Sequence, residues 1–256
     1  MIETLITALF LIFAIQIVFF ALAASFKTDK FTDLSYGLTF VAVVLFLFFT
    51  KSSQSFVQSI TVLLITAWGL RLAGYLFVRI LKTKKDTRFD KIRNDPVKFA
   101  KFWFLQAIAI FIILLPALII LNTQKTASLS FFLIGLVIWC AGFIVESIAD
   151  QQKFVFKSKA ENKDKWIPTG LWKYSRHPNY FGEILIWWGI FIIALPYLEG
   201  WLILSAVGPL FITCLLLFVT GIPTLEKKYE EKYKNDPDFA EYKSQTSPLI
   251  PLPPKI

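Results

Sequence analysis

The sequence is poor in the residues from which metal centres and disulfide frameworks are built. Its 256 residues include one histidine, His177, and two cysteines, Cys140 and Cys214, which both lie inside apolar runs. This supply offers no ligand set for a metal ion and no framework of disulfide bonds. No Gly-x-Gly-x-x-Gly fingerprint is present. A dinucleotide would therefore have to bind without a Rossmann unit.

Charged residues are scarce as well, at 18% of the chain, whereas hydrophobic residues make up 56%. Soluble domains contain about 25% charged and about 45–50% apolar residues. The composition excludes an ordinary cytosolic enzyme, a disordered chain and a nucleic-acid-binding module. It indicates an integral membrane protein.

Seven apolar runs are long enough to cross a bilayer, which requires about 20 mostly apolar residues. We expect helices at residues 4–26, 34–50, 56–81, 100–121, 128–149, 180–197 and 200–222. The first run lacks a preceding basic residue and is too long for a signal peptide, so we interpret it as a true helix. Because no Gly/Ser linker or internal repeat interrupts the chain, we expect residues 1–256 to form a single domain.

The basic residues are distributed very unevenly and account for the net charge of +9. Of the 27 Lys and Arg side chains, 23 follow the first, third, fifth and seventh helices. Only Lys51 and Lys125 lie in the other loops. The positive-inside rule then places the N-terminus outside and the C-terminus in the cytoplasm. The expected fold is an all-α polytopic membrane protein with seven transmembrane helices.

The third predicted helix carries ionisable side chains, which are costly in a membrane and are therefore candidates for function. Arg71, Tyr75 and Arg79 are spaced four residues apart and share one helix face. Arg79 lies near the cytoplasmic end, where its side chain can snorkel to the headgroups. Arg71 lies about 10 Å deeper, which favours a buried role.

Two further charge patterns leave alternatives open. Glu146, Asp150, Lys153 and Lys157 fall on one face at the end of the fifth helix. Ion pairs along the helix explain the charges at its solvent-exposed end. They explain Glu146 poorly, because this residue follows a long apolar run. Asp33, at the start of the second helix, is either an N-cap or a residue with a chemical role.

The sharpest cluster is the segment WIPTGLWKYSRHPNYFGE, residues 166–183, which leads directly into the sixth helix. Asn179, Glu183 and Trp187 share a helix face at four-residue spacing. Arg176 stands just before the helix N-terminus, where free amides and the helix dipole favour anions. We interpret it as a ligand for phosphate or carboxylate. The alternative is a basic loop that lies against anionic lipid.

The stretch GLWKYSRHPNYFGE resembles the cytoplasmic-end motif of the steroid 5-alpha-reductase family, especially its bacterial, DUF1295-type branch of seven-helix membrane proteins. The similarity extends to the preceding WIP, to WGLRLAGYLFVR in the third helix and to the tail PTLEKKYEEKYKNDPDFAEYKSQTSPLIPLPP. It covers roughly residues 33–256 with gaps. The NYFGE run matches the family very closely and the remainder more loosely.

The resemblance implies NADPH-dependent reduction of a carbon–carbon double bond conjugated to a carbonyl in a lipophilic, steroid- or isoprenoid-like substrate. It assigns the substrate mainly to the first four helices. The cofactor is assigned to the last three helices, loop 150–179 and tail 223–256. The implied location is a bacterial inner membrane, with the cofactor site facing the cytoplasm.

The cofactor contacts implied by the resemblance are Glu146, Asp150, Lys157, Trp166, Trp172, Tyr174, Arg176, His177, Asn179, Tyr180, Glu183 and Tyr229. Within this set, Asn179 and Glu183 would hold the nicotinamide carboxamide. The cations would hold the diphosphate and the ribose phosphate.

The substrate side departs from the family pattern. Family members that act on steroids bind the substrate ketone through an adjacent Gln-Glu pair and a tyrosine on the third helix. The pair is not found here, and Trp68 stands where the tyrosine would be. Donors aimed at the carbonyl oxygen would stabilise the negative charge that develops there. The predicted catalytic residues are Asp33, Tyr36, Arg71 and Tyr75, of which Asp33 could donate only if protonated.

Two other function classes remain open. S-adenosylmethionine-dependent membrane methyltransferases of the isoprenylcysteine or phospholipid type also carry an Arg-His-Pro-x-Tyr element before a helical hairpin. The NYFGE run and the supply of cations favour the reductase, because S-adenosylmethionine carries no phosphate. A transporter or scaffold is disfavoured by the lack of internal repeats and broken helices. The basic residues follow the topology, so we expect membrane lipid and no nucleic acid as partner.

Overall fold

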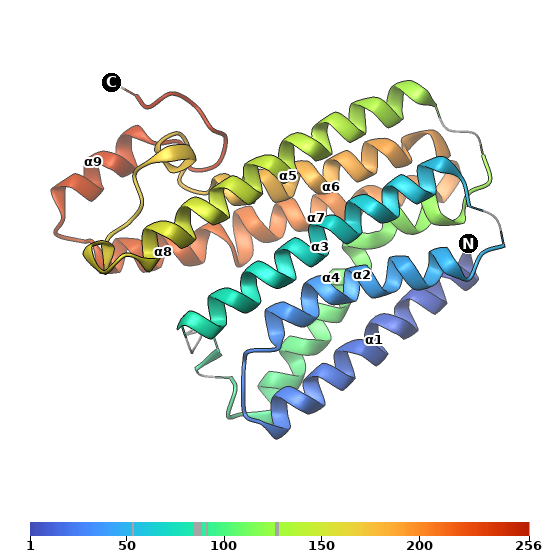
Figure 1. Cartoon of the computed structure of the whole chain (residues 1–256), viewed down its shortest axis with the longest axis horizontal. Coiled ribbons are helices and arrows are strands. Elements are labelled where there is room, and N and C mark those ends of the chain that lie inside the picture. Colours follow the sequence, from blue (N-terminus) through green and yellow to red (C-terminus); the bar gives the residue numbers. More distant parts are fainter. Residues whose placement is uncertain (53, 84–88, 91, 126–127, 256) are drawn as a thin grey trace. The chain divides into compact units, whose positions relative to one another are not determined.

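A computed structural model describes residues 1–52, 54–83, 89–90, 92–125 and 128–255 (Figure 1). These residues form helices and connecting loops, with one isolated parallel bridge between Ser175 and Ser247. Part of the basic stretch after the third helix lies outside the described residues, namely Lys84, Lys85, Arg88 and Lys91.

The main helices are α1 (Ile2–Ser25), α2 (Thr32–Phe49), α3 (Phe56–Thr83), α4 (Pro96–Asn122), α5 (Leu129–Ser158), α6 (Pro178–Ala194), α7 (Val207–Cys214), α8 (Ile222–Lys232) and α9 (Pro237–Gln245). Within the described residues, seven helical segments are long and apolar enough to cross a membrane. The predicted all-α class with seven spanning segments is confirmed. The orientation of the termini stays a prediction.

Helix α5 continues to Ser158, past the predicted spanning run at 128–149, as the shared helix face of Glu146, Asp150, Lys153 and Lys157 indicates. The other predicted spans differ from the observed helices by a few residues at their ends. The seventh span is not one regular α-helix. It begins as a 3₁₀ segment at Gly200–Ala206, continues as α7, and widens into a π-helical turn at Leu215–Val219 before α8.

The described chain divides into two compact units. Unit 1 comprises Met1–Phe132 and Ile193–Gly208, and unit 2 comprises Leu133–Ile192 and Pro209–Ile256. Unit 1 therefore holds α1 to α4, while unit 2 holds most of α5 and α6 together with α8, α9 and the tail. All predicted catalytic residues fall in unit 1, and all predicted cofactor contacts fall in unit 2.

In unit 1, α2 and α3 approach each other closely at two glycines. A Cβ atom added to Gly37 would lie 2.6 Å from the backbone oxygen of Gly69. Such crossings of small residues let helix backbones touch in a membrane. The buried side chains of Phe40 and Trp68 pack edge to face beside this crossing, with ring centroids 5.2 Å apart.

Unit 1 also contains a buried hydrogen-bond network that links α1, α2 and α4. Gln16 Nε2 donates to Thr39 Oγ1 at 2.8 Å. Gln106 Nε2 donates to Gln16 Oε1 at 2.9 Å and to Ser35 Oγ at 3.1 Å. Gln16 and Gln106 carry no sequence signal of this network, because each has apolar residues as its immediate neighbours in the chain.

In unit 2, α5 and α6 cross at a second pair of glycines. A Cβ atom on Gly182 would lie 2.6 Å from both the Gly142 oxygen and the Glu146 nitrogen. The glycine of the NYFGE run is thus one of the residues that allow α6 to touch α5, together with Gly189, where an added Cβ would lie 2.8 Å from the Gly135 oxygen. This close contact places the first two turns of α6 against the segment of α5 that carries the buried Glu146.

Candidate functional site

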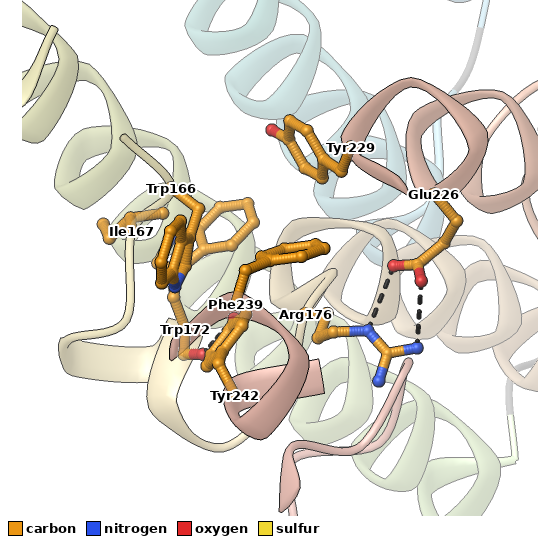
Figure 2. Close-up of a pocket in the computed structure, with 8 residues that line it drawn as sticks. All are labelled: Trp166, Ile167, Trp172, Arg176, Glu226, Tyr229, Phe239 and Tyr242. Carbon is orange, nitrogen blue, oxygen red and sulfur yellow. Dashed lines mark hydrogen bonds and ion pairs between the residues drawn. The ribbon is translucent and has the colours of Figure 1, made fainter. Parts of the chain in front are cut away.

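Unit 2 contains a recess where the loop before α6 meets α8 and α9 (Figure 2). Its lining comes from the loop, from α8 and from α9: Trp166, Ile167, Trp172, Arg176, Glu226, Tyr229, Phe239 and Tyr242. Four of these, Trp166, Trp172, Arg176 and Tyr229, are among the predicted cofactor contacts.

Aromatic rings form one wall of the recess. The Trp166 ring centroid lies 5.2 Å from that of Tyr233 and 5.2 Å from that of Phe239. Tyr242 donates its hydroxyl hydrogen to the Trp172 carbonyl oxygen at 2.7 Å. Burial raises the pKa of Tyr242, which keeps this phenol protonated and able to donate. The wall is therefore an ordered apolar surface.

The loop that carries the two tryptophans is anchored to α5. Trp172 is buried and donates its indole N–H to the Ala149 carbonyl oxygen at 3.0 Å. Gln152 accepts a hydrogen bond from the Leu171 amide at 2.9 Å. Gly170 adopts a φ of +64°, a backbone conformation that favours glycine. The GLW triplet thus supplies the turn and the anchor that hold the loop in place.

Arg176 is engaged by partners within the chain. Its Nε and Nη2 atoms donate to the two carboxylate oxygens of Glu226 at 3.0 and 3.1 Å. Its Nη1 atom donates to the carbonyl oxygens of Lys243 at 2.8 Å and Thr246 at 2.7 Å. The side chain is only 13% exposed. Its predicted contact with a cofactor stays a prediction, and its anionic partner in this structure is Glu226.

His177 shares the same carboxylate. Its Nε2 atom lies 2.9 Å from Glu226 Oε1, and its ring stacks on Tyr180 with centroids 5.6 Å apart. The side chain is 1% exposed, and burial, the largest influence on this ring, lowers the pKa of His177 although Glu226 acts to raise it. A neutral ring then donates from Nε2 to the carboxylate. Its Nδ1 atom has no hydrogen-bond partner among the residues that the structure describes.

The remaining predicted contacts lie nearby in the same unit. Helix α6 begins at Pro178, as its missing amide hydrogen permits at a first helical position. Asn179 and Glu183 follow on its first two turns and are half-buried. Asp150 and Glu146 on α5 are buried. Tyr174, in contrast, is 41% exposed and does not line the recess.

Lysines surround the aromatic side of the site. The Lys153 ammonium lies 4.5 Å from the centroid of the Trp172 ring. Lys153 and Lys157 are close enough to the Tyr229 hydroxyl for their charges to act on it. Lys232 pairs with Asp164 at 2.6 Å. Of these lysines, the resemblance implied only Lys157 as a cofactor contact.

The predicted catalytic residues lie on α2 and α3 in unit 1. Asp33 forms an ion pair with Arg79 at 2.9 Å and lies within the first turn of α2. The N-cap interpretation of Asp33 is wrong, because Phe31 occupies the cap position and no side chain caps the helix. Tyr36 packs edge to face against Phe40, with centroids 5.1 Å apart.

Arg71 and Tyr75 are the other two predicted catalytic residues. Both lie on α3 and are half-buried, and their spacing places them on one helix face with Arg79. The structure thus puts all four candidates on the two helices that cross at Gly37 and Gly69. Their catalytic roles stay predictions.

Comparisons with known proteins identify the family. The chain belongs to the family described as "Protein of unknown function (DUF1295)", which matches residues 19–246. It is similar to 3-oxo-5-alpha-steroid 4-dehydrogenase 1 of Bos taurus, with 29% identity over 42% of this chain and 39% of the relative. An uncharacterized protein of Schizosaccharomyces pombe is 32% identical over 26% of this chain and 25% of the relative.

These matches cover well under two thirds of either relative's own length. No solved structure matches the chain. The predicted resemblance to the steroid 5-alpha-reductase family, through its DUF1295-type branch, is confirmed. The similarity to the steroid 4-dehydrogenase is distant.

Proposed function

We propose that the protein is a membrane-embedded, NADPH-dependent reductase. Its substrate is a lipophilic, steroid- or isoprenoid-like molecule with a carbon–carbon double bond conjugated to a carbonyl. The observation that carries this proposal is the NYFGE run at the start of α6, in the same unit as an aromatic recess surrounded by cations. The similarity to a steroid 4-dehydrogenase supports the same reaction class.

The side chains of unit 2 have the chemistry that a nicotinamide dinucleotide requires. Asn179 and Glu183 together offer hydrogen-bond donors and acceptors that match both ends of a carboxamide. The first amides of α6 and the ammonium groups of Lys153 and Lys157 suit phosphate. Trp166, Trp172 and Tyr229 line the recess, and their rings would contact one part of the cofactor. When bound, NADPH supplies the hydride.

The side chains of unit 1 would act on the substrate. Tyr36, Arg71 and Tyr75 are the donors that we propose for the carbonyl oxygen, on which negative charge develops during reduction. Asp33 is the partner of Arg79, and a paired carboxylate accepts hydrogen bonds. Its contribution would be to hold Arg79 in place. An apolar environment around the substrate would exclude water from the reaction.

The excess of basic residues supports a cytoplasmic position for the cofactor side and, with the bacterial branch of the resemblance, a bacterial inner membrane. Single Lys→Cys changes test this orientation with a membrane-impermeant thiol reagent on intact cells, in a background where Cys140 and Cys214 are replaced. Lys125→Cys should be labelled and Lys163→Cys should be protected. The opposite labelling pattern would reverse the proposed topology.

Glu183→Gln tests the cofactor proposal. Hydrogen bonds to charged groups are worth about 1.5–3 kcal/mol, so NADPH affinity should fall about tenfold or more. The measurement is quenching of tryptophan fluorescence by NADPH in the detergent-purified full chain. The matched control is Glu231→Gln, which removes the same charge from an exposed position on α8.

NADPH oxidation in the presence of a 3-oxo-4-ene steroid or a prenylated enone completes this test. Loss of activity in Glu183→Gln with the control unaffected would support the proposal. Equal NADPH affinity in both variants and in the unmodified protein would remove Glu183 from the site.

A further inference from the structure

Residues 247–252, which follow α9 in the tail, are hydrogen-bonded along the loop that precedes α6. The Arg176 amide donates to the Ser247 carbonyl oxygen at 2.8 Å, and Ser175 Oγ donates to the Leu249 carbonyl oxygen at 2.7 Å. The Leu252 amide donates to the Tyr174 carbonyl oxygen at 3.1 Å. Backbone groups of Tyr174 and Arg176 and the side chain of Ser175 are therefore all hydrogen-bonded to a segment that lies more than 70 residues later in the chain.

Glu226 connects this tail-bound loop to α6. It accepts the two hydrogen bonds from Arg176 and also contacts His177, the last residue before α6 begins. Lys243 on α9 lies 3.8 Å from the same carboxylate. One carboxylate on α8 thus joins the loop, the start of α6 and the tail.

We propose that Arg176 is a positioning residue of the cofactor site and not a phosphate ligand. In this arrangement, which we name the Arg176–Glu226 clamp, Arg176, Glu226 and His177 fix the first turn of α6. The clamp thereby sets the placement of Asn179 and Glu183. This inference rests on the proposed function and assigns a role within the same site.

The existing contacts of Arg176 carry this assignment. Its three guanidinium nitrogens already donate to Glu226 and to two backbone carbonyl oxygens. A phosphate would have to displace partners that are themselves buried or half-buried, which would leave a carboxylate without its main counter-charge. Lys153 and Lys157 are cations of the same unit that do not hold Glu226.

Replacing Glu226 distinguishes the two possible roles of Arg176, phosphate ligand and positioning residue, because they predict opposite changes in NADPH affinity. If Arg176 binds phosphate, Glu226 is a competing negative charge, and Glu226→Gln should strengthen NADPH binding. If the clamp positions α6, the same change removes the charge that pairs with Arg176 and replaces one of the two acceptor oxygens with an NH2 group, so NADPH binding should weaken. The two accounts therefore predict opposite changes from one substitution.

The experiment measures NADPH affinity of the detergent-purified full chain for Glu226→Gln, Arg176→Lys and the double variant, with Glu231→Gln as the control. The clamp predicts that each single variant binds NADPH at least fivefold more weakly. The double variant should bind no more weakly than the weaker single variant, because residues that act as one unit are not additive. Lysine at position 176 keeps the positive charge but lacks the planar guanidinium group, whose several N–H donors bind several partners at once.

A second readout needs no cofactor. Hydrogen exchange of the amides in residues 177–183 and 247–252 reports whether α6 and the tail loosen. The clamp predicts faster exchange in both segments for Glu226→Gln and Arg176→Lys, and unchanged exchange for Glu231→Gln.

Either readout can overturn the inference. Tighter NADPH binding in Glu226→Gln would refute the clamp and favour Arg176 as a phosphate ligand. Unchanged exchange in both segments would also refute the clamp. If the unmodified protein fails to bind NADPH, the proposed function fails, and the exchange of residues 177–183 alone then decides whether the clamp fixes α6.

Discussion

The two units use the same way of bringing helices together but place their polar contacts differently. In each unit, one helix pair touches at glycines: Gly37 with Gly69 in unit 1, and Gly142 with Gly182 in unit 2. In unit 1, neutral side chains within the apolar helices then join α1, α2 and α4 through Gln16 and Gln106. In unit 2, charged side chains from a loop, α8 and the tail gather outside the apolar runs.

This difference follows from the surroundings of each group. Ionised side chains are costly within the apolar part of a membrane, so contacts at that depth are better made by neutral amides and hydroxyls. Charges are affordable where water and other charges can solvate them. In unit 1, the network of Gln16 and Gln106 thus joins helices through neutral groups, whereas in unit 2 Arg176 and Glu226 join a loop, α8 and the tail through charged groups.

The largest effect is expected from Gly182→Ala. The added Cβ would meet backbone atoms of α5 at 2.6 Å, and backbone cannot rotate away as a side chain can. Separating the helices should cost about 1–3 kcal/mol of stability and displace Glu183, so NADPH binding should fall as well. The measurement is the apparent Tm in detergent, with and without NADPH.

Gly74→Ala in unit 1 is the matched control. A Cβ at this position meets nothing within 4 Å. The exchange should leave the Tm unchanged or raise it, because alanine has a higher helix propensity than glycine by about 1 kcal/mol. An equal loss of Tm in both variants would show that the close crossing of α5 and α6 is not what Gly182 provides.

A smaller effect is expected in unit 1 from Gln16→Leu. The change removes the acceptor of the Gln106 amide and the donor to Thr39. Hydrogen bonds between membrane helices are worth about 0.6 kcal/mol on average, so the Tm should fall by a modest amount. The double variant Gln16→Leu with Gln106→Leu should lose less than the sum of the single changes, because no buried amide is then left without its partner. Strict additivity would argue against a network.

The smallest expected effect is the pH dependence of stability that the buried His177 of unit 2 produces. Burial lowers the pKa of His177 from its ordinary value of 6.5, so the unfolded chain binds a proton at a higher pH than the folded protein does. Stability is therefore complete above about pH 6.5 and declines as the pH falls from there through the lowered pKa. Because the chain has one histidine, His177→Gln should remove this part of the Tm–pH curve. An unchanged curve would mean that His177 is not buried in neutral form.

The sequence predicts the fold well, because the signal for a spanning helix is local. Each apolar run is visible without knowledge of its neighbours, and α6 begins at Pro178, within two residues of the predicted start at residue 180. The orientation of the termini is likewise predicted by counting the basic residues in each loop. The NYFGE segment could be singled out because its unusual residues are adjacent in the chain.

The contacts that remained hidden are those between distant positions. Nothing near Glu226 in the sequence indicates that it pairs with Arg176, which lies 50 residues earlier. Asp33 looks like an N-cap because of its place before an apolar run, but its partner Arg79 lies 46 residues later. Gln16 and Gln106 lie 90 residues apart, and each stands among apolar neighbours in its own helix. Only the packing of the helices reveals these pairs.

The most direct test of the central claim is ligand-induced stabilisation of the detergent-purified full chain by NADPH and, separately, by S-adenosylmethionine. A ligand that binds only the folded protein stabilises it by about 2.7 kcal/mol at a concentration of about 100 times Kd. The proposed reductase predicts that the apparent Tm rises with NADPH concentration and is unaffected by S-adenosylmethionine. A rise with S-adenosylmethionine alone would contradict the account and indicate a membrane methyltransferase.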